Sequence, residues 1–110
     1  MISKLYFASV LVGDLADPLE HQGTWFASFT TRLPGAGGNG TEARIWEFIR
    51  FCEDWHGRLG TGSDPDAKEF DAFEDIVKSD SWRVMDGSGT RVLDGAPVFA
   101  NGEASWNYRA

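Results

Sequence analysis

The spacing of apolar residues predicts strands in the first third of the chain. Residues 5–12 are apolar at both odd and even positions, which predicts a strand covered on both faces. Residues 24–33 alternate between apolar and polar side chains, which predicts a half-buried strand. The stretch between them, residues 14–23, is polar and contains Pro18, so it predicts a loop.

The centre of the chain has helical periodicity instead. Over residues 45–59 apolar side chains recur at helical spacing with charged side chains opposite, and Gly60 predicts the helix end. A second, shorter pattern predicts a helix over residues 65–79, with Ser63 or Asp64 as its N-cap.

The last third is predicted to consist of strands joined by tight turns. Asp86-Gly87 and Asp94-Gly95 each predict a chain reversal. Asn101-Gly102 is the strongest hairpin signal, because both residues of such a turn need a positive φ. This turn places Phe99 opposite Ala104.

These elements predict an α+β fold in the order β-β-α-α-β-β-β-β, with a mainly antiparallel sheet and two helices packed on one face. Residues 1–110 are long enough for a single domain that folds without metal or disulfide. The single Cys52 fits a reducing compartment. The N-terminal apolar run is short for a signal peptide, and no apolar stretch is long enough to span a bilayer, so we expect a soluble cytoplasmic protein.

Negative charge is concentrated in residues 64–80. This segment holds seven acidic residues and two lysines, so it carries five of the seven net negative charges of the chain. Such a block repels nucleic acid and anionic membranes and attracts basic surfaces. We therefore expect no direct binding of nucleic acid or membrane. The predicted partner is a basic protein, such as a nuclease or another nucleic-acid-binding protein, contacted by Asp71, Glu74 and Asp75.

Residues 35–40 match the G-x-G-x-x-G pattern of a dinucleotide-binding turn between a strand and a helix. Pro34 opens the turn without an amide to donate, and the following helix leads to another helix rather than to a parallel strand. Cys52 and His56 lie four residues apart, but both fall in the apolar stripe of their helix, where core packing explains them. We expect neither a cofactor nor a metal.

The surplus of aromatic residues supports an alternative hypothesis, a small-ligand-binding protein or small enzyme with an aromatic pocket between sheet and helices. Its candidate residues are Trp46, Trp55, His56 and His21. A homodimer formed through a sheet edge, or through Trp46 and Phe51, is a further hypothesis. The charge pattern favours a small acidic non-catalytic binding protein of the inhibitor or immunity type.

Overall fold

The structure, a computed structural model, describes residues 2–33, 40–62 and 65–109. Within these residues the chain forms seven strands, two α-helices and one 3₁₀ helix. In chain order they are β1 (Ile2–Phe7), β2 (Val10–His21), β3 (Thr24–Thr31), α1 (Gly40–Gly60), η2 (Ala67–Phe73), α2 (Glu74–Val77), β4 (Trp82–Asp86), β5 (Gly89–Val92), β6 (Val98–Ala100) and β7 (Glu103–Trp106).

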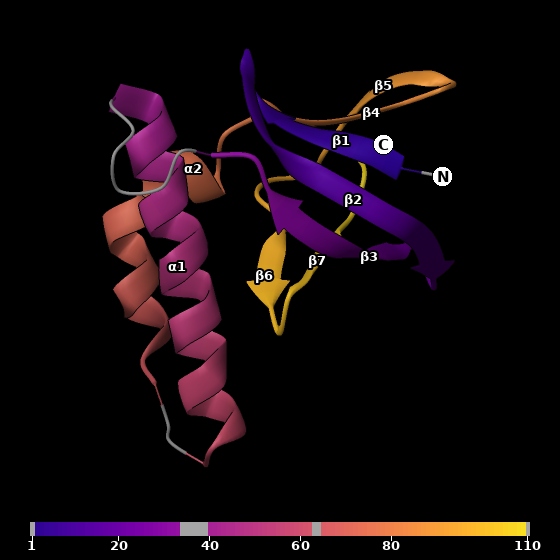
Figure 1. The fold of residues 1–110 in the computed structure, drawn as a ribbon. Helices are drawn as coiled ribbons and strands as arrows, with labels where there is room; N and C mark the ends of the chain where they lie inside the picture. The colour runs from indigo at the N-terminus through magenta and orange to yellow at the C-terminus, as the bar shows by residue number, and fades with distance from the viewer. Residues whose placement is uncertain (1, 34–39, 63–64, 110) are drawn as a thin grey trace.

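All seven strands join one sheet in the order β5-β4-β1-β2-β3-β7-β6, and every neighbouring pair is antiparallel. The helices lie together on one side of this sheet, while the two chain termini lie near each other at the end away from the helices (Figure 1). The predicted α+β class with a mainly antiparallel sheet is therefore confirmed.

The first strand predicted, residues 5–12, is two strands in the structure. A two-residue turn joins Phe7 to its partner Val10, and Ala8 in that turn has a left-handed φ of 53°. An alanine adopts this conformation only at a steric cost, and glycine or asparagine is the usual residue there. Because the turn contains neither, the sequence does not predict it. The unbroken apolar character of residues 5–12 reflects two adjacent central strands.

The prediction of a loop over residues 14–23 was wrong, because most of this segment continues strand β2 to His21. Pro18 lies where the β2–β3 register shifts, and a bulge at that point removes the need for its missing amide hydrogen. The strand then reverses through Gln22 and Gly23, with φ values of 52° and 86°. That pair takes the role that Asn-Gly more commonly has.

Helix α1 buries the stripe that its periodicity predicts: Ile45, Phe48, Ile49 and Cys52. It ends at Gly60, as expected. The glycine-rich pattern before it lies outside the described residues, except for Gly40. The structure therefore does not test the match to a dinucleotide-binding turn.

The second predicted helix, residues 65–79, forms as η2 followed by the short helix α2. The predicted caps, Ser63 and Asp64, lie outside the described residues. Asp66 is the N-cap of η2, and its side chain accepts a hydrogen bond from the backbone of Lys68 at 2.8 Å. Glu69 completes a capping box by accepting from the Asp66 amide at 3.2 Å.

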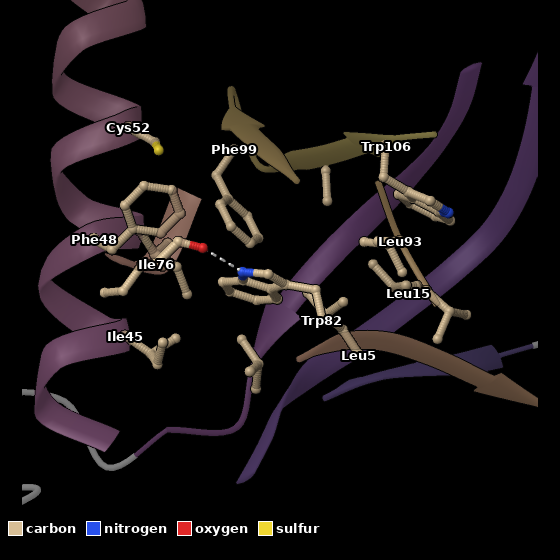
Figure 2. Close-up of a cluster of buried hydrophobic side chains, with 14 of the residues drawn as sticks. Leu5, Leu15, Ile45, Phe48, Cys52, Ile76, Trp82, Leu93, Phe99 and Trp106 are labelled. Atoms are coloured by element: carbon tan, nitrogen blue, oxygen red, sulfur yellow. Dashed lines mark hydrogen bonds between the residues drawn. The ribbon is translucent and has the colours of Figure 1, made fainter. Parts of the chain in front are cut away.

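The core lies between α1 and the sheet, and aromatic rings dominate it (Figure 2). The rings of Phe48, Trp82 and Phe99 meet at centroid distances of 6.3 Å for each pair. Phe48 is also 5.5 Å from Phe73, which ties η2 to this centre. Buried aromatic rings of this size dominate folding energetics, removing roughly 150–250 Å² each from water.

The C-terminal turns follow the sequence closely. Asn101 has a φ of 55°, and the hairpin pairs Phe99 with Ala104 as predicted. A second hairpin closes at Asp86, whose carboxylate accepts from the Ser88 amide at 2.7 Å. Gly95, with a φ of 83°, passes so close to α2 that a β-carbon there would lie 2.9 Å from a backbone oxygen.

Candidate binding surfaces

The acidic segment, here residues 66–80, is displayed along the outer side of the helical layer. Six carboxylates and two lysines fall in it, and five of the six carboxylate residues are exposed, with Glu69 half-buried. The segment is fixed from beneath by apolar contacts of Phe70, Phe73 and Ile76 with the core. The backbone that carries the charged side chains is therefore packed against the core.

Two arginines of α1 bind the acidic segment to the helix. Arg44 donates to the carbonyl oxygen of Ala72 at 2.7 Å and to the carboxylate of Asp75 at 2.9 Å. Arg58 binds Glu69 through two hydrogen bonds, of 2.8 and 3.3 Å, and contacts Asp54 at 3.2 Å. Paired guanidinium–carboxylate contacts of this kind add geometric definition.

The three predicted contact residues differ in their surroundings. Glu74 pairs with Lys78 at 2.7 Å, and Asp75 pairs with Arg44. Asp71 is exposed and forms no ion pair with any described residue. The pairs at Glu74 and Asp75 are solvent-exposed, and exposed pairs contribute little to stability, so a partner can replace them at low cost.

The pKa shifts in this region follow these contacts. The hydrogen bond from Arg58 is the main cause of a lowered pKa at Glu69, and the same hydrogen bond raises the pKa of Arg58. The hydrogen bond to Glu74 raises the pKa of Lys78. These groups therefore stay fully charged around neutral pH.

The residues of the alternative hypothesis do not form one site. Trp55 and His56 stack edge-on at 5.0 Å on α1, and the indole of Trp55 donates to the Asp66 carbonyl at 3.2 Å. Trp46 lines a separate pocket of about 270 Å³ between α1 and β3, under the guanidinium of Arg50 at 5.3 Å. His21 is exposed at the end of β2.

Cys52 is a core residue. It is 2 % exposed, and burial raises the pKa of its thiol to about 12, partly offset by the backbone of Phe99. Figure 2 shows its sulfur on the side of α1 that faces the aromatic core. Across residues 2–33, 40–62 and 65–109, no three His, Cys, Asp or Glu side chains gather as a metal site would require.

A larger pocket, of about 590 Å³, opens at the end of the sheet away from α1. We call it the sheet-end pocket. Its walls combine two aromatic rings, two carboxylates, one guanidinium and the hydroxyl of a serine: Trp25, Tyr108, Asp17, Asp86, Arg91 and Ser3. Pro18 and Leu19, from the bulged part of β2, complete the lining. The rings of Trp25 and Tyr108 meet edge-on at 5.8 Å.

Sequence reasoning points to only part of this pocket. The alternation of residues 104–108 puts Tyr108 in a buried row with Ala104 and Trp106, and Trp106 pairs with Trp25 across β7 and β3. Nothing in the sequence associates Asp17 with Arg91, because their place in one pocket depends on the order of four strands, β5-β4-β1-β2. Because residues 14–23 were predicted to form a loop, the β-bulge of β2 that contains Asp17 was not predicted either.

Among the described residues, no helix has both the length and the apolar character needed to cross a membrane. No family model, curated protein or solved structure matches the chain. The functional argument therefore rests on the chemistry of these two surfaces.

Proposed function

We propose that this protein is a small, non-catalytic binding protein whose acidic segment docks on a basic surface of a protein partner. The observation that carries the proposal is the exposed carboxylate array of residues 66–80, in which Asp71 has no ion-pair partner among the described residues. A carboxylate array of this kind can occupy a groove built to bind phosphates. The partner class that fits is a nuclease or another nucleic-acid-binding protein.

The arrangement of the array supports this function. Asp71 and Glu74 are three residues apart at the end of the 3₁₀ helix, a spacing that puts side chains on one face. Asp75 follows directly, and its side chain is 69 % exposed despite the contact with Arg44. Asp71 and Glu74 therefore share one face, and Asp75 lies beside it, toward Arg44.

Rigidity of the support favours binding as well. Arg44 and Arg58 hold the segment to α1, and the capping box at Asp66 defines its first turn. A preorganised surface loses less conformational entropy on association than a mobile one. The arginines therefore orient the array, although each one also neutralises part of its charge.

The test is affinity capture from a lysate of the source organism with three tagged proteins. These are the wild type, the D71N/E74Q/D75N variant, and a control variant, E47Q/D94N/E103Q, that removes the same charge from exposed positions elsewhere. We expect the wild type and the control to retain the same basic protein at low salt, and the first variant to lose it. Equal retention by all three folded proteins would overturn the proposal.

A further inference from the structure

We propose that the sheet-end pocket binds a small zwitterion that carries an aromatic or large apolar group, such as a free aromatic amino acid or a short peptide with such a side chain. This site is separate from the acidic segment, and its lining residues come from β1 to β5 and the C-terminal Tyr108. A volume of about 590 Å³ lies within the size range of small-molecule sites, roughly 300–1,000 Å³.

The apolar walls select the ring or apolar group. Trp25 and Tyr108 meet edge-on, and Pro18 and Leu19 add aliphatic surface. Leu19 is 68 % exposed, so it presents apolar surface to solvent at the pocket. A ligand ring placed there would cover apolar surface that water now contacts.

The charges of the lining select a ligand with both signs. The guanidinium of Arg91 lies 3.6 Å from the centre of the Tyr108 ring, a cation–π contact that holds the arginine at the pocket. Neither Arg91 nor Asp17 forms an ion pair with any described residue. Asp86 accepts one hydrogen bond, from Ser88, through one oxygen.

A ligand with a single charge pairs with only part of this lining. A carboxylate would pair with Arg91 in a lining that also holds Asp17 and Asp86, and an ammonium group would pair with a carboxylate in a lining that also holds Arg91. A zwitterion places a carboxylate on the guanidinium and an ammonium group on a carboxylate. The lining is therefore complementary to the ammonium and carboxylate groups of a free amino acid or of a short peptide.

The backbone at Asp17 supports a functional role for this residue. Its φ is 54°, a left-handed conformation that only a few per cent of non-glycine residues adopt. It lies in the bulge of β2, and bulges commonly re-aim a side chain beside a binding site. The bulge places Asp17 in the lining of the pocket, where its charge is paired with no described residue.

A buried, unpaired donor lies beside two lining residues of the sheet-end pocket, although its own side chain lines a neighbouring, smaller pocket. Trp106 is 4 % exposed, and its indole N–H has no hydrogen-bond acceptor among the described residues. Figure 2 shows that this nitrogen lies on the side of the ring away from α1. The ring of Trp106 lies 6.2 Å from that of Tyr108, and its strand partner is Trp25. Unpaired buried polar groups in folded proteins are rare, and a bound water, an ion or a functional role commonly accounts for one.

The test is isothermal titration of the wild type with L-phenylalanine, phenethylamine, hydrocinnamate and glycyl-phenylalanine. Phenethylamine lacks the carboxylate and hydrocinnamate lacks the ammonium group, so we expect each to bind roughly tenfold or more weakly than the better of the two zwitterions. A preference for the amino acid or for the dipeptide then identifies the source of the ligand. The proposal would be overturned if none of the four compounds released or absorbed heat. It would also be overturned if phenethylamine or hydrocinnamate bound as tightly as the better zwitterion.

Variants locate the site. We expect R91Q and D17N each to weaken binding of the zwitterion, while R83Q and D94N, which make the same changes at exposed positions outside the pocket, leave it unchanged. Unchanged binding by folded R91Q and D17N would contradict the assignment. The acidic segment is intact in all four variants, so this result is independent of partner binding.

Discussion

The indole N–H of Trp82 donates a hydrogen bond of 2.9 Å to the carbonyl oxygen of Ile76, inside the core between β4 and α2 (Figure 2). Both residues are fully buried or nearly so, at 0 % and 1 % exposed. The contact fastens the end of the acidic segment to the sheet. The charged surface is thus connected to the most buried part of the molecule.

Replacing Trp82 by phenylalanine should destabilise the fold more than the same replacement at Trp106. Both indoles are buried, but only that of Trp82 has a hydrogen-bond acceptor. W82F removes this hydrogen bond and leaves the Ile76 carbonyl with the amide of Ser79, at 3.3 Å, as its donor. Its free energy of unfolding should therefore fall by about 1 kcal/mol more than that of W106F. Urea denaturation measures both, and equal losses would contradict the role of this hydrogen bond.

Gly13 should tolerate no side chain. A β-carbon there would overlap the carbonyl oxygen of Thr30 and the ring of Phe29, both on the neighbouring strand β3. G13A should lower the free energy of unfolding by roughly 1–3 kcal/mol, the usual cost of overpacking. G57A is the matched control, because an added β-carbon meets nothing on the exposed side of α1. It should stabilise the protein by up to about 1 kcal/mol, and similar effects of the two changes would refute the argument.

The contact between Arg58 and Glu69 should make stability depend on pH below the usual range of a glutamate. Because the pKa of Glu69 is lowered in the folded state from its ordinary value of 4.5, the contact contributes stability above that value. The contribution is lost as pH falls through the lowered folded pKa. The stability difference between wild type and E69Q should therefore be largest near neutral pH and shrink on acidification. A difference that is constant with pH would contradict this assignment.

The thiol of Cys52 should react with alkylating reagents only after unfolding. With a pKa of about 12, its thiolate fraction at mildly alkaline pH is about a thousandfold below that of an ordinary cysteine. Its side chain is also nearly inaccessible. Labelling of the native protein should thus follow the unfolding rate, and fast labelling under native conditions would show that Cys52 is reachable from solvent.

The sequence predicts elements well where local chemistry alone determines them. The buried stripe of α1 and the Asn101-Gly102 hairpin, with Phe99 opposite Ala104, form as expected. Strand β2 escaped prediction because Ala8 and Gln22 adopt turn conformations that other residues favour, and because a bulge accommodates Pro18. The conformational preferences of single residues are averages over many proteins. In this segment the pairing of β2 with its neighbouring strands outweighs them.

The candidate sites show the same division. The exposure of Asp71, Glu74 and Asp75 follows from helical spacing, which is local. The contact from Arg44 to Asp75 joins residues 31 positions apart, and only the packing of α2 on α1 brings them together. The sheet-end pocket depends on the order and register of the strands, so the periodicity of a single sequence cannot predict it.

The most direct test of the central claim is the affinity of the captured basic partner for wild type and for D71N/E74Q/D75N, measured at about 50 mM and about 500 mM salt. We expect the variant to bind roughly tenfold or more weakly at low salt, and the two affinities to converge at high salt as screening removes the charge contribution. The E47Q/D94N/E103Q control should behave as wild type. Equal affinities of wild type and variant at low salt would contradict binding through the acidic segment.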